Sequence, residues 1–257
     1  MLEMRYQDLF NLVIICSLGF LAAMVDAIAG GGGLISLPAL LMVGIPPHLA
    51  LGTNKFAASV ASFNSSLTFA RSGKVHFPLV KWQIPFTLLG AFLGAWAVLK
   101  VSSEFLNKAV LFLILFVGVY TLFRKNLGMK NTFKGLNSSR IVVGCLFALI
   151  LGFYDGFFGP GTGSFLIFSF IAFFGFDFVI ASANSKVLNF SSNIASLLFF
   201  AWNGKIIYQY GIPMALFMIL GSYVGTRLAI RRGAVLVKPL FVIMSLLVAA
   251  KIIYQYV

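Results

Sequence analysis

Long apolar stretches dominate the chain, and polar residues interrupt them at only a few places. Leu9 to Ala29, Val80 to Leu99 and Phe105 to Phe123 each approach the ~20 residues that an apolar helix needs to cross a bilayer. The strands of a membrane β-barrel would instead alternate apolar and polar residues over ~10 positions, and this alternation is absent from the sequence. The pattern therefore predicts an all-α polytopic membrane protein, with about eight to ten transmembrane segments.

One apolar stretch is too short to cross a bilayer by itself. Four glycines, Gly30 to Gly33, precede Leu34 to Val43, which spans only ten residues before Gly44-Ile45-Pro46-Pro47 ends it. This spacing predicts a half-helix that begins at a glycine break. The next stretch, His48 to Ala70, is apolar but carries many Ser, Thr and Asn residues, which predicts a helix with a polar face.

The second half of the chain repeats the landmarks of the first. Asp155 follows Asp26 by 129 positions, and after a two-residue insertion the offset of 131 relates Lys186 to Lys55. A second glycine-rich break, Gly159 to Gly163, follows Asp155. This register predicts two homologous repeats, each with a glycine-broken half-helix. We place them at residues 1–124 and 140–257, joined by a basic loop at 125–139.

Composition and charge support a membrane location. Hydrophobic residues make up 60% of the 257 positions and charged residues 10%, against about 25% charged residues in soluble domains. The net charge of +13 does not indicate a nucleic-acid partner, because the basic residues lie mostly in short loops, where they orient membrane helices. The basic central loop is predicted to be cytoplasmic.

Basic residues leave two arrangements of the repeats open. If each half-helix completes a crossing, each half crosses five times, the repeats are inverted and both termini lie outside the cytoplasm. If the half-helix is re-entrant, each half crosses four times and the repeats are parallel. Either arrangement places 11 basic residues inside and 5 outside. The inverted form is favoured, because the parallel form leaves Arg231, Arg232 and Lys238 outside.

Four charged residues, Asp26, Lys55, Asp155 and Lys186, lie in apolar surroundings, where each charge costs about 2.5 to 3.5 kcal/mol at the bilayer centre. One interpretation is structural, with Asp–Lys bridges that hold the halves together. The other is functional, because half-helices that start at the breaks direct free N–H groups and a positive dipole end toward an anion. Discontinuous helices at a repeat interface form the substrate sites of secondary transporters.

The functional interpretation selects two sets of candidate residues. Asp26 and Asp155 are candidate proton carriers. The candidate substrate-binding residues are Gly31, Gly32, Gly33, Asn54, Lys55, Gly161, Thr162, Gly163, Ser164, Lys186, Asn189 and Asn193. No cofactor or metal is expected. Gly159 to Gly163 lacks the Lys-Ser/Thr that completes a phosphate-binding loop, and neither His48 nor His76 has Glu or Cys residues clustered nearby.

The residues around the two breaks resemble those of a known family. The resemblance rests on Asp26 to Leu34, on Thr53-Asn54-Lys55, on Tyr154 to Pro160 and on Lys186 to Asn193. These segments are similar to the TauE/SafE (TSUP) membrane transporter family, especially its YfcA-like branch, over nearly the whole chain. The resemblance implies a permease of the bacterial inner membrane, in a family linked to sulfite, sulfoacetate and other small sulfur-containing anions.

We therefore expect a secondary transporter of a small anion, coupled to protons, with the lipid bilayer as its surroundings. The alternatives are an anion channel and an intramembrane enzyme. An enzyme would need an acid–base or nucleophilic constellation, and the sequence offers none beyond the two Asp/Lys pairs. The sequence leaves open which anion is carried, in which direction and with which coupling ion, and whether the protein is a homo-oligomer.

Overall fold

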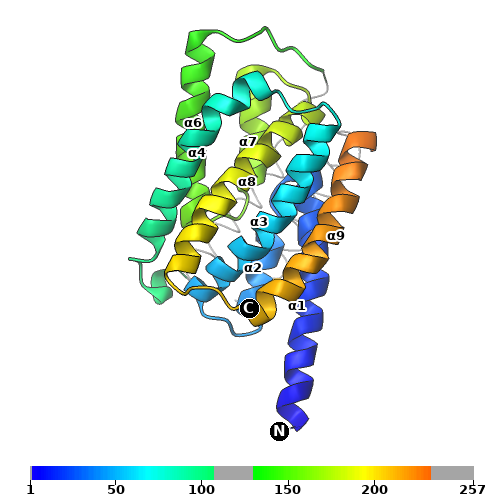
Figure 1. Cartoon of the computed structure of the whole chain (residues 1–257), viewed down its shortest axis with the longest axis vertical. Helices are drawn as coiled ribbons and strands as arrows, with labels where there is room; N and C mark the ends of the chain where they lie inside the picture. The colour runs from blue at the N-terminus through cyan, green and yellow to red at the C-terminus, as the bar shows by residue number, and fades with distance from the viewer. Residues whose placement is uncertain (1, 107–129, 233–257) are drawn as a thin grey trace, which may run out of the picture.

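A computed structural model describes residues 2–106 and 130–232. The described residues form helices and loops, with no β-strand among them. The helices are α1 (Leu2–Ala29), α2 (Gly33–Met42), α3 (Pro47–Arg71), α4 (Phe77–Val98), α6 (Ser138–Phe157), α7 (Thr162–Ser169), the π-helix η1 (Phe170–Phe174), α8 (Phe178–Trp202) and α9 (Tyr208–Arg232) (Figure 1). All but the first two residues of the predicted span Phe105 to Phe123 lie outside the described residues. The end of the second predicted repeat, residues 233–257, also lies outside them.

The helices have the lengths and compositions of a membrane protein. Within residues 2–106 and 130–232, three segments are long and apolar enough to cross a bilayer: Gln7–Ala29, Ser138–Phe157 and Tyr208–Arg232. The shorter apolar helices Gly33–Met42 and Thr162–Phe174 follow the two glycine breaks. The predicted all-α membrane fold is confirmed.

The two polar helices, α3 and α8, lie against each other in the middle of the molecule (Figure 1). They run in opposite directions. A Cβ atom at Gly52, near the start of α3, would lie 1.9 Å from the carbonyl oxygen of Lys205, beyond the end of α8. Ser66, near the end of α3, donates to the carbonyl of Lys186, in the first half of α8 (2.7 Å). Most of their Ser, Thr and Asn side chains are buried against protein in the interior, where neighbouring groups can satisfy their hydrogen bonds.

Glycines bring the outer helices into contact with the opposite half of the chain. α4 lies against α6, where a Cβ atom at Gly94 would come within 2.1 Å of the carbonyl oxygen of Phe153. α1 lies against α9, where a Cβ atom at Gly225 would come within 2.3 Å of the carbonyl oxygen of Met24. Small residues at this spacing allow such close backbone contact. The two halves are thereby interlocked.

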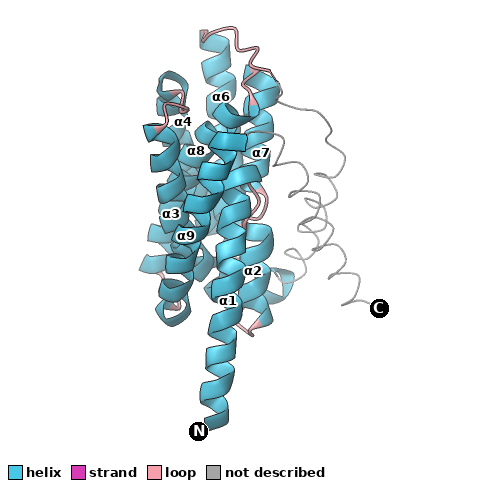
Figure 2. Cartoon of the chain, turned by 90° about the vertical axis from the view of Figure 1, so that its right-hand side faces the viewer, coloured by secondary structure: helices cyan, strands magenta, loops and turns pink. Residues whose placement is uncertain are grey.

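Both half-helices return toward the end from which the preceding helix came. In Figure 1, α1 begins at the lower end and stops near mid-height, and α2 leads back down to the loop at 43–46. α6 begins at the upper end, and α7 leads back up. Figure 2 shows loop segments at mid-height between α2 and α7. The half-helices are therefore re-entrant.

The count that links re-entrant half-helices to parallel repeats takes α1 and α6 as complete crossings. Both helices instead end at the two breaks, which contact each other in the interior. α1, α3 and α4 each run opposite to α6, α8 and α9, respectively (Figure 1). This is the direction that inverted repeats require, and the repeat relation itself stays a prediction.

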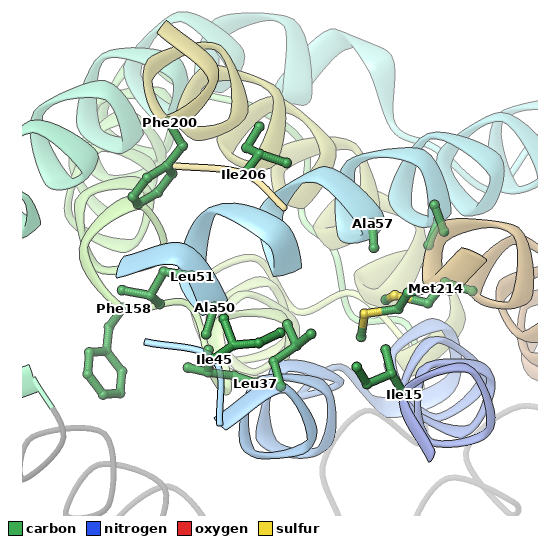
Figure 3. Close-up of a cluster of buried hydrophobic side chains, with 14 of the residues drawn as sticks. Ile15, Leu37, Ile45, Ala50, Leu51, Ala57, Phe158, Phe200, Ile206 and Met214 are labelled. Atoms are coloured by element: carbon green, nitrogen blue, oxygen red, sulfur yellow. The ribbon is translucent and has the colours of Figure 1, made fainter. Parts of the chain in front are cut away.

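Two apolar clusters enclose a polar middle layer. The lower cluster lies toward the loops at 43–46 and 203–207, and it includes Leu37, Ile45, Phe158, Phe200 and Met214 (Figure 3). The upper cluster lies toward the loop at 72–76. It includes Ile28, Phe69, Leu79, Phe147, Phe170, Phe174 and Phe176. The charged residues and glycine breaks of the interior lie between these clusters.

Candidate functional site

Two ion pairs in the interior, one buried and one partly buried, join the halves of the chain. Lys55 Nζ lies 2.8 Å from Asp155 Oδ2, and Lys186 Nζ lies 2.6 Å from Asp26 Oδ2. In each pair, an aspartate just before a break meets a lysine on the central helix of the other half. The structure therefore shows the Asp–Lys bridges that the structural interpretation requires, and the functional interpretation uses the same four residues.

Neighbouring polar groups complete the coordination of these charges. Asp26 Oδ1 accepts a hydrogen bond from the backbone N–H of Gly32 (3.1 Å), at the start of α2. Ser192 donates to Asp155 (2.5 Å), and Lys55 donates to Asn193 Oδ1 (3.0 Å). Buried charges persist only when partners of this kind satisfy them. The carboxylate of Asp26 therefore already accepts from one of the free N–H groups at the N-terminus of α2.

The two breaks lie directly against each other. Gly30 and Gly161 have φ values of 74° and 85°, in the left-handed region that favours glycine. A Cβ atom at Gly30 would lie 2.3 Å from the backbone of Gly163, and one at Gly33 would lie 3.1 Å from Pro160 Cα. Ser164 donates to the carbonyl of Ala29 across the contact (3.1 Å). Glycine is therefore required in the breaks, both for the left-handed backbone conformation and because the packed backbones leave no room for a side chain.

A cavity of about 40 Å³, measured as the space open to the centre of a water-sized sphere, lies beside the breaks. One water molecule needs roughly 10–15 Å³ on this measure, so the cavity has room for a small ligand. Its walls come from the two breaks and from α1, α2, α3, α6, α8 and α9. The lining residues are Ala23, Asp26, Gly31, Gly32, Gly33, Ser36, Asn54, Lys55, Ala58, Ala61, Ser65, Asp155, Gly159, Gly161, Gly163, Asn189, Asn193, Met218 and Ser222.

Most of the predicted site residues line this cavity, but Thr162, Ser164 and Lys186 do not. Thr162 donates to the carbonyl of Gly159 (2.8 Å), so its hydroxyl stabilises the backbone of the second break. The side chain of Lys186 is completely buried, and its ammonium group contacts Asp26. Of the two lysines, only Lys55 reaches the cavity wall.

Comparison with known proteins identifies the family. The model of the family described as "Sulfite exporter TauE/SafE" matches residues 15–252. The chain belongs to the TauE/SafE family. A Haemophilus influenzae protein named "Probable membrane transporter protein" is 41% identical over 244 residues, covering 95% of each chain. "Probable membrane transporter protein YfcA" of Escherichia coli K12 is 38% identical over 238 residues, covering 91% of this chain and 87% of the relative.

These relationships make this TauE/SafE protein a membrane transporter rather than an enzyme. A third relative, "Probable membrane transporter protein ORF9" of a Sinorhizobium species, is 38% identical over 241 residues, covering 91% of this chain and 89% of the relative. No solved structure matches the chain.

Several cavity residues of this TauE/SafE protein were missed in the sequence. On α3, the small residues Ala58, Ala61 and Ser65 follow Asn54 at helical spacing of three or four, and this spacing is the signal that would have found them. Met218 and Ser222 come from α9, whose sequence carries no charge or break at these positions. Only the packing of α9 beside α3 brings them to the cavity.

The two halves contribute unequally to the site. The Asp26 side chain is 24% exposed, whereas that of Asp155 is 2% exposed. Asn54 is also buried at the cavity wall, and among the described residues its Oδ1 atom has no hydrogen-bond partner. Lys55, Asp26 and Asn54 are therefore the polar side chains most available to a ligand.

Proposed function

We propose that this protein is a secondary transporter of a small anion, a sulfur-containing oxyanion or an organosulfonate such as sulfite or sulfoacetate, in the bacterial inner membrane. One observation carries the proposal: the Lys55 ammonium group lines a cavity beside two glycine breaks. The name of the matching family, sulfite exporter, supports the choice of anion.

The chemistry of the cavity suits a compact oxyanion. Lys55 offers a point charge and, beside its contacts with Asp155 and Asn193, a further N–H donor, which can contact an anion without a fixed planar geometry. Asn54 on α3 and Asn189 and Asn193 on α8 also line the cavity. The helix that begins at the second break presents its positive end to the cavity through Gly161 and Gly163. These groups replace the water that an anion loses on entering.

Charge balance supports coupling to protons. The four charged residues form two neutral pairs, so an anion that binds beside Lys55 leaves one uncompensated negative charge in the interior. A proton taken up at the same time restores neutrality. Asp26 is the preferred carrier, because its carboxylate lines the cavity and is more exposed than that of Asp155.

Uptake into proteoliposomes tests the function. Purified protein should accumulate labelled sulfite, or a small sulfonate, with saturable kinetics, and an excess of the unlabelled anion should compete. A channel would instead produce an ohmic current without accumulation. A panel of sulfite, thiosulfate, sulfonates and carboxylates identifies the anion. Failure of every member of the panel to enter vesicles above the level of protein-free vesicles would contradict the proposal.

A further inference from the structure

The cavity-facing side of each central helix leads to a phenylalanine. On α3, Asn54, Ala58, Ala61 and Ser65 line the cavity at steps of three or four residues, and the next position on this face is Phe69. On α8, Asn189 and Asn193 line the cavity, and the same steps lead through Ser196 to Phe200. Because the two helices run in opposite directions, the phenylalanines lie toward opposite ends of the molecule.

Both phenylalanines are held in apolar clusters. Phe69 is 0% exposed and belongs to the upper cluster, with Ile28 and Ala29 from the end of α1. Phe200 is 1% exposed and belongs to the lower cluster, with Phe158 from the end of α6 (Figure 3). Each aromatic ring therefore lies in an apolar layer that separates the polar middle from one end of the molecule.

We propose that Phe69 and Phe200 are the two gates of the transporter. Both rings are buried in this structure, and this is the position in which each would close the cavity toward one end. Displacement of Phe69 opens the cavity toward the upper end, and displacement of Phe200 opens it toward the lower end. The offset of 131 residues that relates Lys55 to Lys186 also relates Phe69 to Phe200. The proposal depends on transport by the chain but not on the identity of the anion.

The two gates differ in their distance from the cavity along the helix axis. The cavity reaches Ser65, one helical turn or ~6 Å along the axis from Phe69. Polar contacts continue the path there, since Thr226 donates to Ser65 (3.1 Å) and Asn64 donates to Ser222 (2.8 Å). On α8, the last lining residue is Asn193, seven positions or ~10 Å from Phe200. The Phe69 gate is therefore the thinner barrier.

Thiol labelling tests the gates directly. Replacing Cys16 and Cys145 by alanine gives a cysteine-free background, into which Ser65→Cys or Ser196→Cys is introduced. These positions correspond in the two halves, and each lies one turn before its gate. A membrane-impermeant methanethiosulfonate that carries a sulfonate group is added to spheroplasts or to inverted vesicles, which expose opposite faces.

Each cysteine is combined with Phe69→Ala, Phe200→Ala or the control Phe63→Ala. Phe63 also lies on α3, but it is 51% exposed and away from the cavity. Phe69→Ala should speed labelling of Ser65→Cys by about tenfold or more, because truncating a buried ring makes local opening easier. Phe200→Ala should do the same for Ser196→Cys, from the opposite face, and Phe63→Ala should change neither. With both gates intact, Ser65→Cys should react faster than Ser196→Cys.

Three results would overturn the proposal: equal acceleration by Phe63→Ala, acceleration of both cysteines by either gate variant, or no acceleration by the gate variants. Labelling is measured on protein that elutes as a single peak in detergent. If an alanine variant does not fold, Phe69→Leu and Phe200→Leu replace it, and unchanged labelling in both would overturn the proposal. The experiment needs no transported substrate. Gate-specific labelling without anion uptake would therefore reject the proposed function and leave the gates in place.

Discussion

Among individual residues, Lys55 and Lys186 occupy corresponding positions but differ in what their ammonium groups contact. Lys55 contacts Asp155 and Asn193 and lines the cavity, whereas Lys186 contacts Asp26 and does not line the cavity. The structure therefore gives unequal surroundings to two residues that the sequence predicts to be equivalent. We propose Lys55 as the residue that binds the anion and Lys186 as the residue that holds Asp26 in place.

Neutralising one ion pair at a time separates these roles. A single Lys→Gln change leaves a buried carboxylate without its partner, which costs about 3–5 kcal/mol, whereas replacing both members of a pair costs far less. Lys55→Gln/Asp155→Asn should therefore fold but bind the anion about 10- to 100-fold more weakly, the loss expected for one charge-assisted contact. Lys186→Gln/Asp26→Asn should fold and bind within a few-fold of wild type.

Anion-dependent thermal stabilisation in detergent measures both affinities. Equal affinity in the two double variants would contradict the assignment of Lys55 to the substrate. Much of this site was predictable from the sequence, because charges and glycines in an apolar stretch are conspicuous. The unequal positions of Lys55 and Lys186 were not predictable, since they depend on how α9 packs beside α3.

At the level of secondary-structure elements, contact between backbones determines where helices cross. On α9, a Cβ atom at Gly225 would lie 2.3 Å from the carbonyl oxygen of Met24, which is backbone and cannot move independently. A Cβ atom at Gly211 of the same helix would instead meet the side chain of Phe56 at 3.1 Å. The two glycines therefore differ in how readily the neighbouring atoms can adjust.

Gly225→Ala should lower the stability of the folded protein by about 1–3 kcal/mol, because α1 and α9 must separate. It should also weaken anion binding, since Met24 lies two residues before Asp26. Gly211→Ala is the matched control. Its stability should remain close to wild type, because the ring of Phe56 can adjust and alanine favours the helix by about 1 kcal/mol. Thermal unfolding in detergent gives both values, and an equal loss in the two variants would be inconsistent with a backbone contact at Gly225.

The helices themselves were largely predictable, because their apolar lengths, their Pro and Gly boundaries and the repeated landmarks are local features of the sequence. The course of the half-helices was not. An apolar stretch that ends in four glycines reads the same whether the chain continues across the bilayer or returns. The outcome depends on packing of the first break against Gly163 and Pro160 of the second, which are about 130 residues away.

For the whole molecule, basic side chains predict the orientation in the membrane. Arg71 ends α3 and Lys74 follows it, while Arg231 and Arg232 end α9. These helix ends lie at the upper end of the molecule, where residues 130–137 also lie (Figure 1). Lys205 lies in the loop at the lower end. The positive-inside rule therefore places the upper end in the cytoplasm.

Two corresponding loop residues distinguish inverted from parallel halves. Ser72 and Asn203 are related by the offset of 131, and both are exposed. In the cysteine-free background, Asn203→Cys should react with an impermeant maleimide in spheroplasts, whereas Ser72→Cys should react only in inverted vesicles. Labelling of both positions from the same face would show that the halves are parallel and would contradict the arrangement described here.

Uptake of the anion into proteoliposomes, driven by a pH gradient, tests whether proton-coupled transport uses this cavity. With the outside more acidic than the inside, the wild-type protein should concentrate the anion, because the proposed mechanism has each anion beside Lys55 enter with a proton. Lys186→Gln/Asp26→Asn should bind the anion but lose concentrative uptake, because it lacks the proposed proton carrier, and Lys55→Gln/Asp155→Asn should lose uptake through weak binding. Concentrative uptake at the wild-type level in the Lys55→Gln/Asp155→Asn variant would show that the anion does not use this cavity.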